Sequence, residues 1–398
     1  MAGALDGIKV IDLTTVVMGP WAAQMLGDMG ADVIKVETPT GDISRAMGPY
    51  RNKGMAAVFL TTNRNKRSIV LDLNQRAGLK ALRRLIDKAD VFMHNLRPKI
   101  MNKFGLCYDT FREKNKDLVY CASYGFRADG PLGDKPAYDD VIQTAAGVCD
   151  LMTLFGGQPR FVPTLFADKT AAYAVFSAIL AAIVQRERGG GGQAVEVPMY
   201  ETLVDFVMVE HLYGATFDPP IAPLGYERLM NSQRRPYATK DGFLTVLPYT
   251  DKNWRDFFEL SGHREMSKEP VFATHTARIQ NSETVYKTLG EIISKRTTAE
   301  WLYDLNSANI PVMEVRTKEE LLEDEQLKAT GFWHEIKHPT EGNLRFTDPP
   351  FRYSKTPSAI RAMPPLLGEH SFDILREAGY SAKEIEDLFT QKVSQMSV

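Results

Sequence analysis

Short apolar runs alternate with helical segments through the N-terminal 126 residues, and this alternation restricts the fold more than any other feature of the sequence. The run GIKVIDL (7–13) precedes a helical segment, WAAQMLGDMG, which is followed by a second apolar run, ADVIKVE. We expect Gly19-Pro20 to interrupt the chain between the first strand and this helix. The runs RSIVLDL, DVFMHN and DLVYCASYGF continue the pattern. Because such β-α-β units build parallel sheets, the sequence predicts an α/β domain with a doubly wound sheet, whose ligands lie beyond the carboxyl ends of its strands.

The chain changes character at about residue 224, where short strands such as GFLTVLP and helices such as TVYKTLGEIISKR begin. Its 398 residues are more than one compact core usually holds, so we expect two domains. A Pro-rich segment from about residue 332 is expected to run back to the large domain and end in two helices, SFDILREAG and SAKEIEDLF. We therefore predict a large domain over 1–223, a smaller α+β middle domain over 224–331 and a returning segment over 332–398.

Composition restricts the partners and the compartment. A formal net charge of −2 gives no bias toward nucleic acid or membrane surfaces. The three cysteines include no C-x-x-C pair, which favours a reducing compartment. The first residues lack the pattern of an export signal, and the longest apolar stretch, 171–184, is too short to span a bilayer. We expect a cytoplasmic protein without membrane or nucleic-acid partners.

Positive charge is concentrated between Arg45 and Lys103, where 14 Lys and Arg residues stand against three Asp, a local balance of +11. Five of these cations lie on one predicted helix and are explained by a solvated helix face. The other nine lie in turns and near strand ends, where anionic ligands are usually held. A solvated surface and an anion-binding site both remain open at this point.

Two other ligand classes are disfavoured. Glu37 ends the second predicted strand, where an acid would hold the ribose of a dinucleotide, but the first turn reads VVMGPWAAQ instead of G-x-G-x-x-G. Pro20 also removes a backbone donor that a pyrophosphate would need. His334 and His338 are four residues apart on a predicted strand that ends at a turn, and no third ligand accompanies them, so we expect no metal.

Asp168 directly precedes the predicted helix KTAAYAVFSAILAAI. In this position its carboxylate suits an N-cap, accepting hydrogen bonds from the first free amides of the helix. The same position suits a nucleophile, because a helix N-terminus keeps a carboxylate ionised and offers N–H groups to a developing oxyanion. Position alone leaves both interpretations open.

A series of phrases resembles family III (class III, CaiB/BaiF-type) coenzyme A transferases in order and spacing, over nearly the whole chain. This group includes formyl-CoA transferase and succinyl-CoA:glutarate CoA-transferase, and α-methylacyl-CoA racemases are its relatives. The phrases are NRNKRSIVLDL, HNLRPKIMNKFGL, ASYGFRADGPL, PAYDDVIQTAAG, LFADKTAAYAVFSAILAAI, GGGGQAVEVPMYE and LLGEHSFDILREAGYSAKEIEDL. The resemblance implies a large Rossmann-like domain built from both termini, a small middle domain, and an interlocked homodimer.

The resemblance also implies a function and its site. Asp168 matches the family's catalytic aspartate in the A-D-x-x-(A/G) segment. The implied substrates are an acyl-CoA and a small carboxylic acid, and the implied intermediates are aspartyl anhydrides and an aspartyl-CoA thioester, with no metal. CoA contacts fall by resemblance on Lys66, Asn95, Leu96, Lys103 and Tyr138. Charge alone adds Arg45 and Arg97 as candidates for the CoA phosphates.

Departures from the family pattern limit what can be carried over. His94 and Lys99 replace the usual Glu and Gly of E-N-x-R-P-G, which suggests a changed rim of the CoA cleft. Pro248-Tyr249-Thr250 replaces the glycine-rich loop of formyl-CoA transferase, so oxalate is not the expected acid. In the predicted small domain, three arginines suggest a dicarboxylic acid instead: Arg228, Arg234 and Arg235.

Two other functions stay open beside CoA transfer. An α-methylacyl-CoA racemase of the same fold would need an acid and a base on opposite faces of the α-carbon. The racemases have a His where this chain has Tyr138, and a phenol is a poor proton acceptor at neutral pH. Asp139 or Asp140 could replace that base, so the racemase alternative remains. The third possibility is a CoA-binding protein without turnover.

Overall fold

The structure is a computed structural model, and it describes residues 2–397. Contacts within the chain divide it into two units. The first comprises Met1–Val148, Phe161–Phe206 and Ala329–Val398, and the second comprises Cys149–Arg160 and Val207–Lys328. The second unit therefore begins before the boundary expected at residue 224 and includes a short earlier segment. Whether residues 224–331 form a domain that folds by itself stays a prediction.

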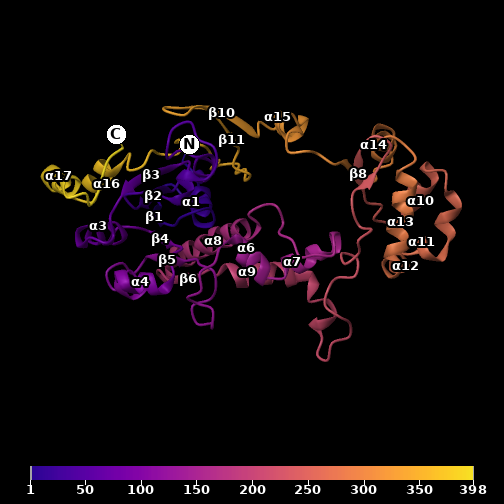
Figure 1. Ribbon diagram of the computed structural model, residues 1–398, viewed down its shortest axis with the longest axis horizontal. Coiled ribbons are helices and arrows are strands. Elements are labelled where there is room, and N and C mark those ends of the chain that lie inside the picture. Colours follow the sequence, from indigo (N-terminus) through magenta and orange to yellow (C-terminus); the bar gives the residue numbers. More distant parts are fainter. Residues whose placement is uncertain (1, 398) are drawn as a thin grey trace. The chain divides into compact units, whose positions relative to one another are not determined.

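A six-stranded parallel sheet forms the first unit, in the order β3-β2-β1-β4-β5-β6 (Figure 1). The strands are β1 (Lys9–Leu13), β2 (Asp32–Glu37), β3 (Lys66–Val70), β4 (Val91–His94), β5 (Val119–Ala122) and β6 (Ala194–Glu196). The predicted α/β fold with a parallel sheet is confirmed. The chain builds outward in one direction from β1 to β3 and in the other from β4 to β6. The boundary between β1 and β4 is thus the switch point of the sheet, where α/β proteins bind ligands.

Alternate residues of the strands feed two separate cores, because successive side chains point to opposite faces of a sheet. On one face Ile11, Ile34 and Phe92 pack with the helices that follow β3 and β4. On the other face Val10 and Val33 pack with α1 and α8. The helices of this unit are α1 (Met18–Asp28), α2 (Ala57–Thr62), α3 (Arg76–Ile86), α4 (Pro98–Phe104), α5 (Tyr108–Phe111), α6 (Asp139–Ala145), α8 (Phe166–Gln185), α16 (Ser371–Glu377) and α17 (Ala382–Thr390).

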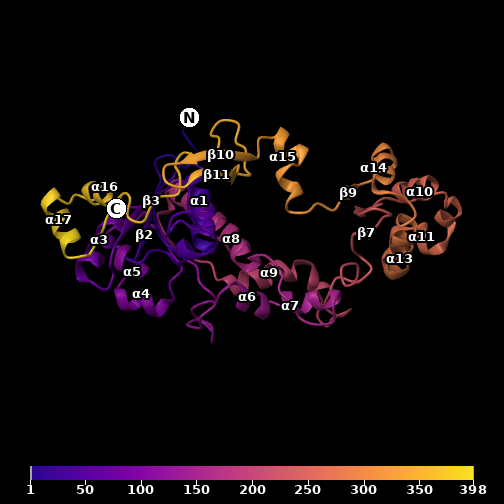
Figure 2. The same ribbon diagram turned by 45° about the horizontal axis from the view of Figure 1, so that its top comes forward.

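The C-terminal part of the chain completes this unit. Helices α16 and α17 lie beside α3 and β3 in both views (Figures 1 and 2). Backbone hydrogen bonds join the two regions, from the N–H of His370 to the carbonyl of Ser68 (3.0 Å) and from the N–H of Asp72 to the carbonyl of Val393 (2.8 Å). The returning segment also holds an antiparallel hairpin, β10 (Trp333–His338) and β11 (Gly342–Thr347), and the predicted strand over the His334–His338 pair is confirmed.

Two helix starts differ from the sequence-based expectation. Helix α1 begins at Met18 and contains Gly19-Pro20 in its first turn, so the expected chain break there is wrong. Proline is tolerated in a first turn because the N–H that it lacks has no partner within the helix. A side chain at Gly19 would lie 2.3 Å from the Thr14 side chain, which explains the glycine.

Helix α8 begins at Phe166, two residues before Asp168. By length and composition alone, Phe166–Gly190 is apolar enough to cross a membrane, and it is the single such helix within residues 2–397. Half of its apolar window is buried. Val175, Phe176 and Ile179 lie in the core that α8 shares with α1, which is the pattern of a central packing helix.

The second unit contains a three-stranded antiparallel sheet and an aromatic core. Its strands are β7 (Tyr237–Ala238), β8 (Phe243–Val246) and β9 (Val312–Glu314). Its main helices are α10 (Asp251–Leu260), α11 (Pro270–Ala273), α12 (His275–Gln280), α13 (Ser282–Ile293) and α14 (Thr298–Ser307). Trp254, Phe257 and Trp301 are buried at the centre. Three shorter or connecting helices complete the chain, α7 (Val148–Leu151), α9 (Met199–His211) and α15 (Glu325–Ala329).

Candidate active site

A cavity of about 310 Å³ opens in the first unit at the carboxyl ends of β1, β4 and β5, which is the switch point of the sheet. The loops after these strands supply most of its wall, and α8 supplies Asp168. Four of the residues predicted to bind CoA line it together with Asp168: Asn95, Leu96, Arg97 and Tyr138. Lys66, Arg45 and Lys103 are not part of this wall.

Asp168 is the third residue of α8 and only 8% exposed. Its backbone N–H donates to Oδ1 of Asp139 on α6 (2.9 Å), and the N-cap residue of α8 is Leu165, which makes no side-chain cap. The N-cap interpretation of Asp168 is therefore wrong, because a carboxylate from another helix accepts from the first turn instead. Among the described residues, no hydrogen bond reaches the carboxyl group of Asp168 itself. This group is free to react at the cavity wall.

Burial raises the pKa of Asp168 to about 7, and the neighbouring carboxylates of Asp139 and Asp140 add to the shift. The helix start alone had suggested the opposite, an ionised carboxylate. Asp139 is itself buried and accepts a second hydrogen bond, from Nε2 of Gln143 (2.6 Å). No cation is paired with Asp168 among residues 2–397, so nothing offsets the cost of burying its charge.

The loop between β1 and α1 also lines the cavity, in a backbone conformation that needs support. Val16 has φ of 74°, in the left-handed region, where a β-branched residue is strained. Its N–H donates to Oδ1 of Asp42 (3.1 Å). The side-chain amide of Asn95 brackets Thr15, accepting from its N–H (3.0 Å) and donating to its carbonyl (2.8 Å). Asn95 thus shapes the cavity through the backbone of its neighbour.

Lys66 lies away from the cavity, in the buried layer beneath that loop. It is 1% exposed, and its ammonium donates to Asp12 (3.0 Å), the Pro20 carbonyl (2.7 Å) and Asn63 (2.9 Å). Burial and the nearby Lys35 lower the pKa of Lys66 to about 8. All three donors of the ammonium are occupied, so the predicted contact of Lys66 with CoA is corrected to a structural role.

Arg45 is also committed to the protein. Its guanidinium makes a two-pronged ion pair with Glu37, with both N–O distances at 2.7 Å, and lies 3.7 Å above the ring of Phe59. Only 4% of the residue is exposed. The phosphate contact suggested for Arg45 on charge alone is therefore corrected too. Both carboxylate oxygens of Glu37, the acid considered for a dinucleotide ribose, are occupied by this ion pair.

These two corrections have one cause. The count of +11 included only acids that lie between Arg45 and Lys103, whereas the partners lie elsewhere in the chain. The ion pairs with earlier acids are Lys66–Asp12, Arg64–Asp28, Arg67–Asp32 and Arg45–Glu37. Acids from outside the segment therefore neutralise part of the positive charge that was counted along the sequence.

The cations left near the cavity come from its lip. Arg97 is exposed at the start of α4 and donates to the carbonyl of Asp134 (2.9 Å). Lys103 lies in the last turn of α4, exposed and outside the cavity wall. Lys135 does line the cavity, and sequence reasoning missed it because it lies beyond the basic segment. Its place three residues before Tyr138, in the motif DKPAYDD, was the available signal.

His94 does not alter the rim of the cleft as the motif comparison suggested. Its ring is buried in β4, 2.9 Å from the phenol of Tyr120, and burial lowers its pKa to about 3. The ring is therefore neutral at physiological pH and packs within the sheet. Lys99 is exposed on α4. The described part of the chain contains no cluster of three or more His, Cys, Asp or Glu side chains that could hold a metal ion.

The sequence is similar to that of proteins of known family. The chain matches the family model described as CoA-transferase family III over residues 5–371. It is 33% identical over 382 residues to succinate–glutarate CoA-transferase of Agrobacterium fabrum, covering 94% of this chain and 95% of that protein. It is 28% identical over 401 residues to succinyl-CoA:glutarate CoA-transferase of Homo sapiens, covering 98% and 89%.

A solved structure gives the same relation in three dimensions. A CaiB/BaiF family protein from Brucella suis superposes on this chain with a TM-score of 0.79 at 28% sequence identity. The match covers 95% of this chain and all of the other. The likeness therefore extends over both units and not only over the parallel sheet.

Proposed function

This chain belongs to CoA-transferase family III and is a CoA-transferase, and on that premise we propose that it moves CoA from an acyl-CoA to a free carboxylic acid through covalent intermediates on Asp168. The observation that carries the proposal is the state of this carboxyl group. It is buried, faces the cavity at the switch point, and has neither a cation nor a hydrogen bond to hold it. A carboxylate so placed is a better nucleophile than a solvated one.

The chemistry proceeds in four balanced steps. Ionised Asp168 attacks the thioester carbonyl of the donor and expels CoA thiolate, which leaves a mixed anhydride. The thiolate attacks the aspartyl carbonyl of this anhydride, which releases the donor acid and leaves an aspartyl-CoA thioester. The acceptor carboxylate attacks that thioester, giving a second anhydride and thiolate. The thiolate then takes the acyl group and frees Asp168. Exclusion of water preserves the energy of the thioester throughout.

The cavity suits the CoA part of both substrates. Arg97 and Lys135 supply positive charge for the phosphates, and Leu96 and Tyr138 supply apolar surface. Tyr138 is 66% exposed, so its ring is available to a ligand. Lys103 remains a proposed contact farther out on α4. For the acid we propose a dicarboxylic acid, supported by the succinate and glutarate in the names of the relatives.

The test uses Asp168→Ala with succinyl-CoA as donor and glutarate as acceptor. We expect transfer to fall by about 10⁴-fold or more, as when other covalent nucleophiles are removed, and CoA affinity to change only a few-fold. Asp140→Asn, the matched control beside the site, should keep its activity. Hydroxylamine added to the wild type with succinyl-CoA should leave a hydroxamate at Asp168, detected by mass spectrometry.

Two results would contradict the proposal. One is substantial transfer by Asp168→Ala. The other is deuterium uptake at the α-carbon of a 2-methylacyl-CoA in D₂O, dependent on Asp168 and without CoA exchange into any acid. That outcome would establish the racemase alternative.

We further propose that the protein is an interlocked homodimer, which rests on the family resemblance. Interlocked chains cannot separate without unfolding, so dilution should not release a folded monomer. Light scattering on a dilution series checks this, and a native species of 44.6 kDa, the mass of one chain, would exclude it.

A further inference from the structure

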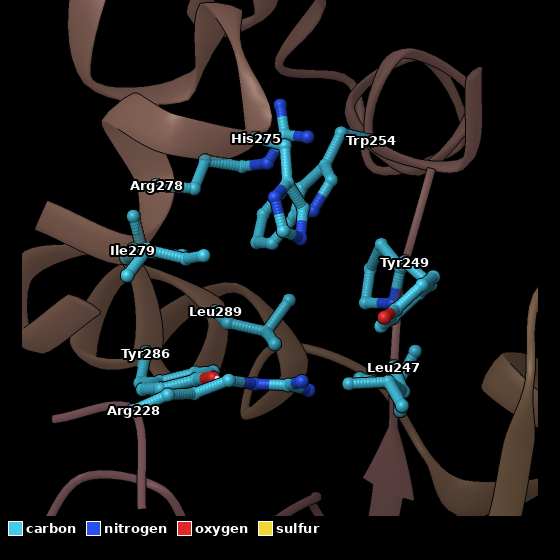
Figure 3. A pocket seen from close by; sticks show the side chains of 12 residues that line it. Arg228, Leu247, Tyr249, Trp254, His275, Arg278, Ile279, Tyr286 and Leu289 are labelled. Carbon is cyan, nitrogen blue, oxygen red and sulfur yellow. Dashed lines mark hydrogen bonds between the residues drawn. The ribbon is translucent and has the colours of Figure 1, made fainter. Parts of the chain in front are cut away.

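The second unit has a small cavity of its own, of about 40 Å³, at the end of β8 and between α10, α12 and α13 (Figure 3). A cavity of this size holds about three water-sized groups, which matches a carboxylate and one methylene. Its inner wall is apolar and buried, and it includes Val246, Trp254 and Leu289. All of its lining residues belong to the second unit.

The charges in this wall are of one sign. Arg228 and Arg278 line the cavity, and no Asp or Glu does. Arg278 is already satisfied, since it pairs with Asp251, donates to the carbonyl of Phe272 (2.6 Å) and lies over the ring of Trp254. Its charge is therefore not available to a ligand in the way that a free guanidinium would be.

Arg228 is different. Its Nε donates to the phenol of Tyr286 (3.0 Å), and its guanidinium lies 5.7 Å from the ring centre of Tyr249. No carboxylate pairs with it among residues 2–397, and its polar neighbours are the phenols of Tyr286 and Tyr226. Figure 3 shows its side chain running along Tyr286, with the guanidinium pointing toward the space bounded by Leu289 and Leu247. A half-buried guanidinium without a carboxylate partner, beside a cavity that no acid lines, favours the binding of an anion.

The outer lip of the cavity is fixed in position. It is formed by Tyr249 and His275, whose rings meet edge to face 6.0 Å apart. The neighbouring Thr250 caps α10 reciprocally with Asn253: the N–H of Asn253 donates to Oγ1 of Thr250 (3.1 Å), and the N–H of Thr250 donates to Oδ1 of Asn253 (3.2 Å). The cap thus anchors the segment Pro248-Tyr249-Thr250 at the start of α10, and such preorganisation lowers the cost of ordering a bound group.

We infer that this cavity binds one carboxylate on a short apolar stem, with Arg228 as its ionic partner. The carboxylate accepts from the Nη groups of Arg228, and the stem packs against Leu289 and Val246. The inference goes beyond the proposed transfer chemistry, because it assigns a second site in the other unit. The bound acid is either one that the enzyme also uses as a substrate or one that it does not.

Binding is measured by calorimetric titration of glutarate into the full-length protein. Losing a charge-assisted pair should weaken the affinity of Arg228→Leu about 10- to 100-fold. Arg228→Lys keeps the charge and should recover part of the loss, which guards against a folding defect in the Leu variant. Arg264→Leu removes an exposed arginine of the same unit and should bind like the wild type. Equal binding by Arg228→Leu and the wild type, or equal loss in Arg264→Leu, would overturn the inference.

Kinetics with the same variants separates the sources. If the bound acid is also a substrate, Arg228→Leu raises KM for glutarate more than KM for valerate, which has the same length and one carboxylate. If the acid is not a substrate, glutarate binding falls while both KM values stay unchanged. Binding that disappears in Asp168→Ala and persists in Arg228→Leu would locate the acid at Asp168 alone and refute a second site. Failure of the transfer mechanism is read separately, from the activity of Asp168→Ala.

Discussion

Two groups of buried carboxylates flank the candidate active site, and they meet opposite surroundings. Beneath the Thr14–Val16 loop, Asp12 pairs with Lys66, and Asp42 pairs with Lys35 (2.8 Å). The charges that shift the pKa of Asp168, by contrast, are both carboxylates, Asp139 and Asp140. Burial raises the pKa of both Asp12 and Asp42, but the adjacent lysines and hydrogen bonds together outweigh it, and the net pKa is lowered. At Asp168 nothing outweighs burial. All of these acids are buried, so the charge of the neighbouring side chains distinguishes the structural acids from the reactive one.

The largest effect is expected where a buried pair is cut. Lys66→Met leaves Asp12 buried without its cation, which costs about 3–5 kcal/mol in comparable pairs. Arg67→Met is the matched control, because the next residue of β3 pairs with Asp32 and Glu377 at the surface, where such pairs contribute about 1 kcal/mol or less. Thermal unfolding of the two variants measures the contrast. A Lys66→Met protein no less stable than Arg67→Met would remove the distinction between the regions.

Replacing a buried Asp by Asn should have opposite effects on stability in the two regions. A folded-state pKa of about 7 means that folded Asp168 holds its proton more tightly than the unfolded chain, whose pKa is near 3.8. Its stabilising contribution is complete below about pH 4 and is lost as pH rises through 7. The free energy of unfolding of Asp168→Asn should therefore exceed that of the wild type at pH 8. The excess is up to about 4 kcal/mol, because the folded and unfolded pKa values differ by about three. At pH 4 the two proteins should be nearly equal in stability.

Asp12→Asn supplies the comparison. The pKa of Asp12 is lowered in the folded protein, so its carboxylate stabilises the fold at pH values above the ordinary pKa of 3.8. We expect this variant to be less stable than the wild type at pH 7. Denaturant midpoints measured from pH 4 to pH 8 give both curves. Destabilisation of Asp168→Asn across the whole range would mean that Asp168 has a structural partner.

The smallest effect concerns the pH dependence of catalysis. Asp139→Asn removes the nearest charge but keeps an oxygen to accept from the N–H of Asp168 (2.9 Å). The pKa of Asp168 should fall, so the acidic limb of kcat/KM, which we expect near pH 7 in the wild type, should move to lower pH. Asp140→Asn should move it less, because Asp140 contributes less to the shift and is exposed. A limb that stays in place or moves upward would exclude Asp139 as the cause.

Sequence reasoning succeeded where one segment is sufficient. The apolar runs predicted the strands of the parallel sheet. The motif also named Asn95, Leu96 and Arg97, which line the cavity with Asp168, while their contact with CoA stays a prediction. It failed where the decisive partner is distant along the chain. Lys66 looked available because Asp12 lies 54 residues earlier, and the two meet only when the sheet forms. Asp168 looked like a cap because Asp139, which accepts from its N–H, comes from another helix.

The way the chain returns to the first unit has a consequence for its synthesis on the ribosome. Ile374, Leu375, Ile385 and Leu388 belong to the same core as the N-terminal strands, so that core stays open until α16 and α17 have emerged. The stretch Val207–Lys328 is continuous and complete much earlier. While that stretch is being synthesised, β1 to β5 still expose one apolar face, and that face needs protection from aggregation until α16 and α17 are available.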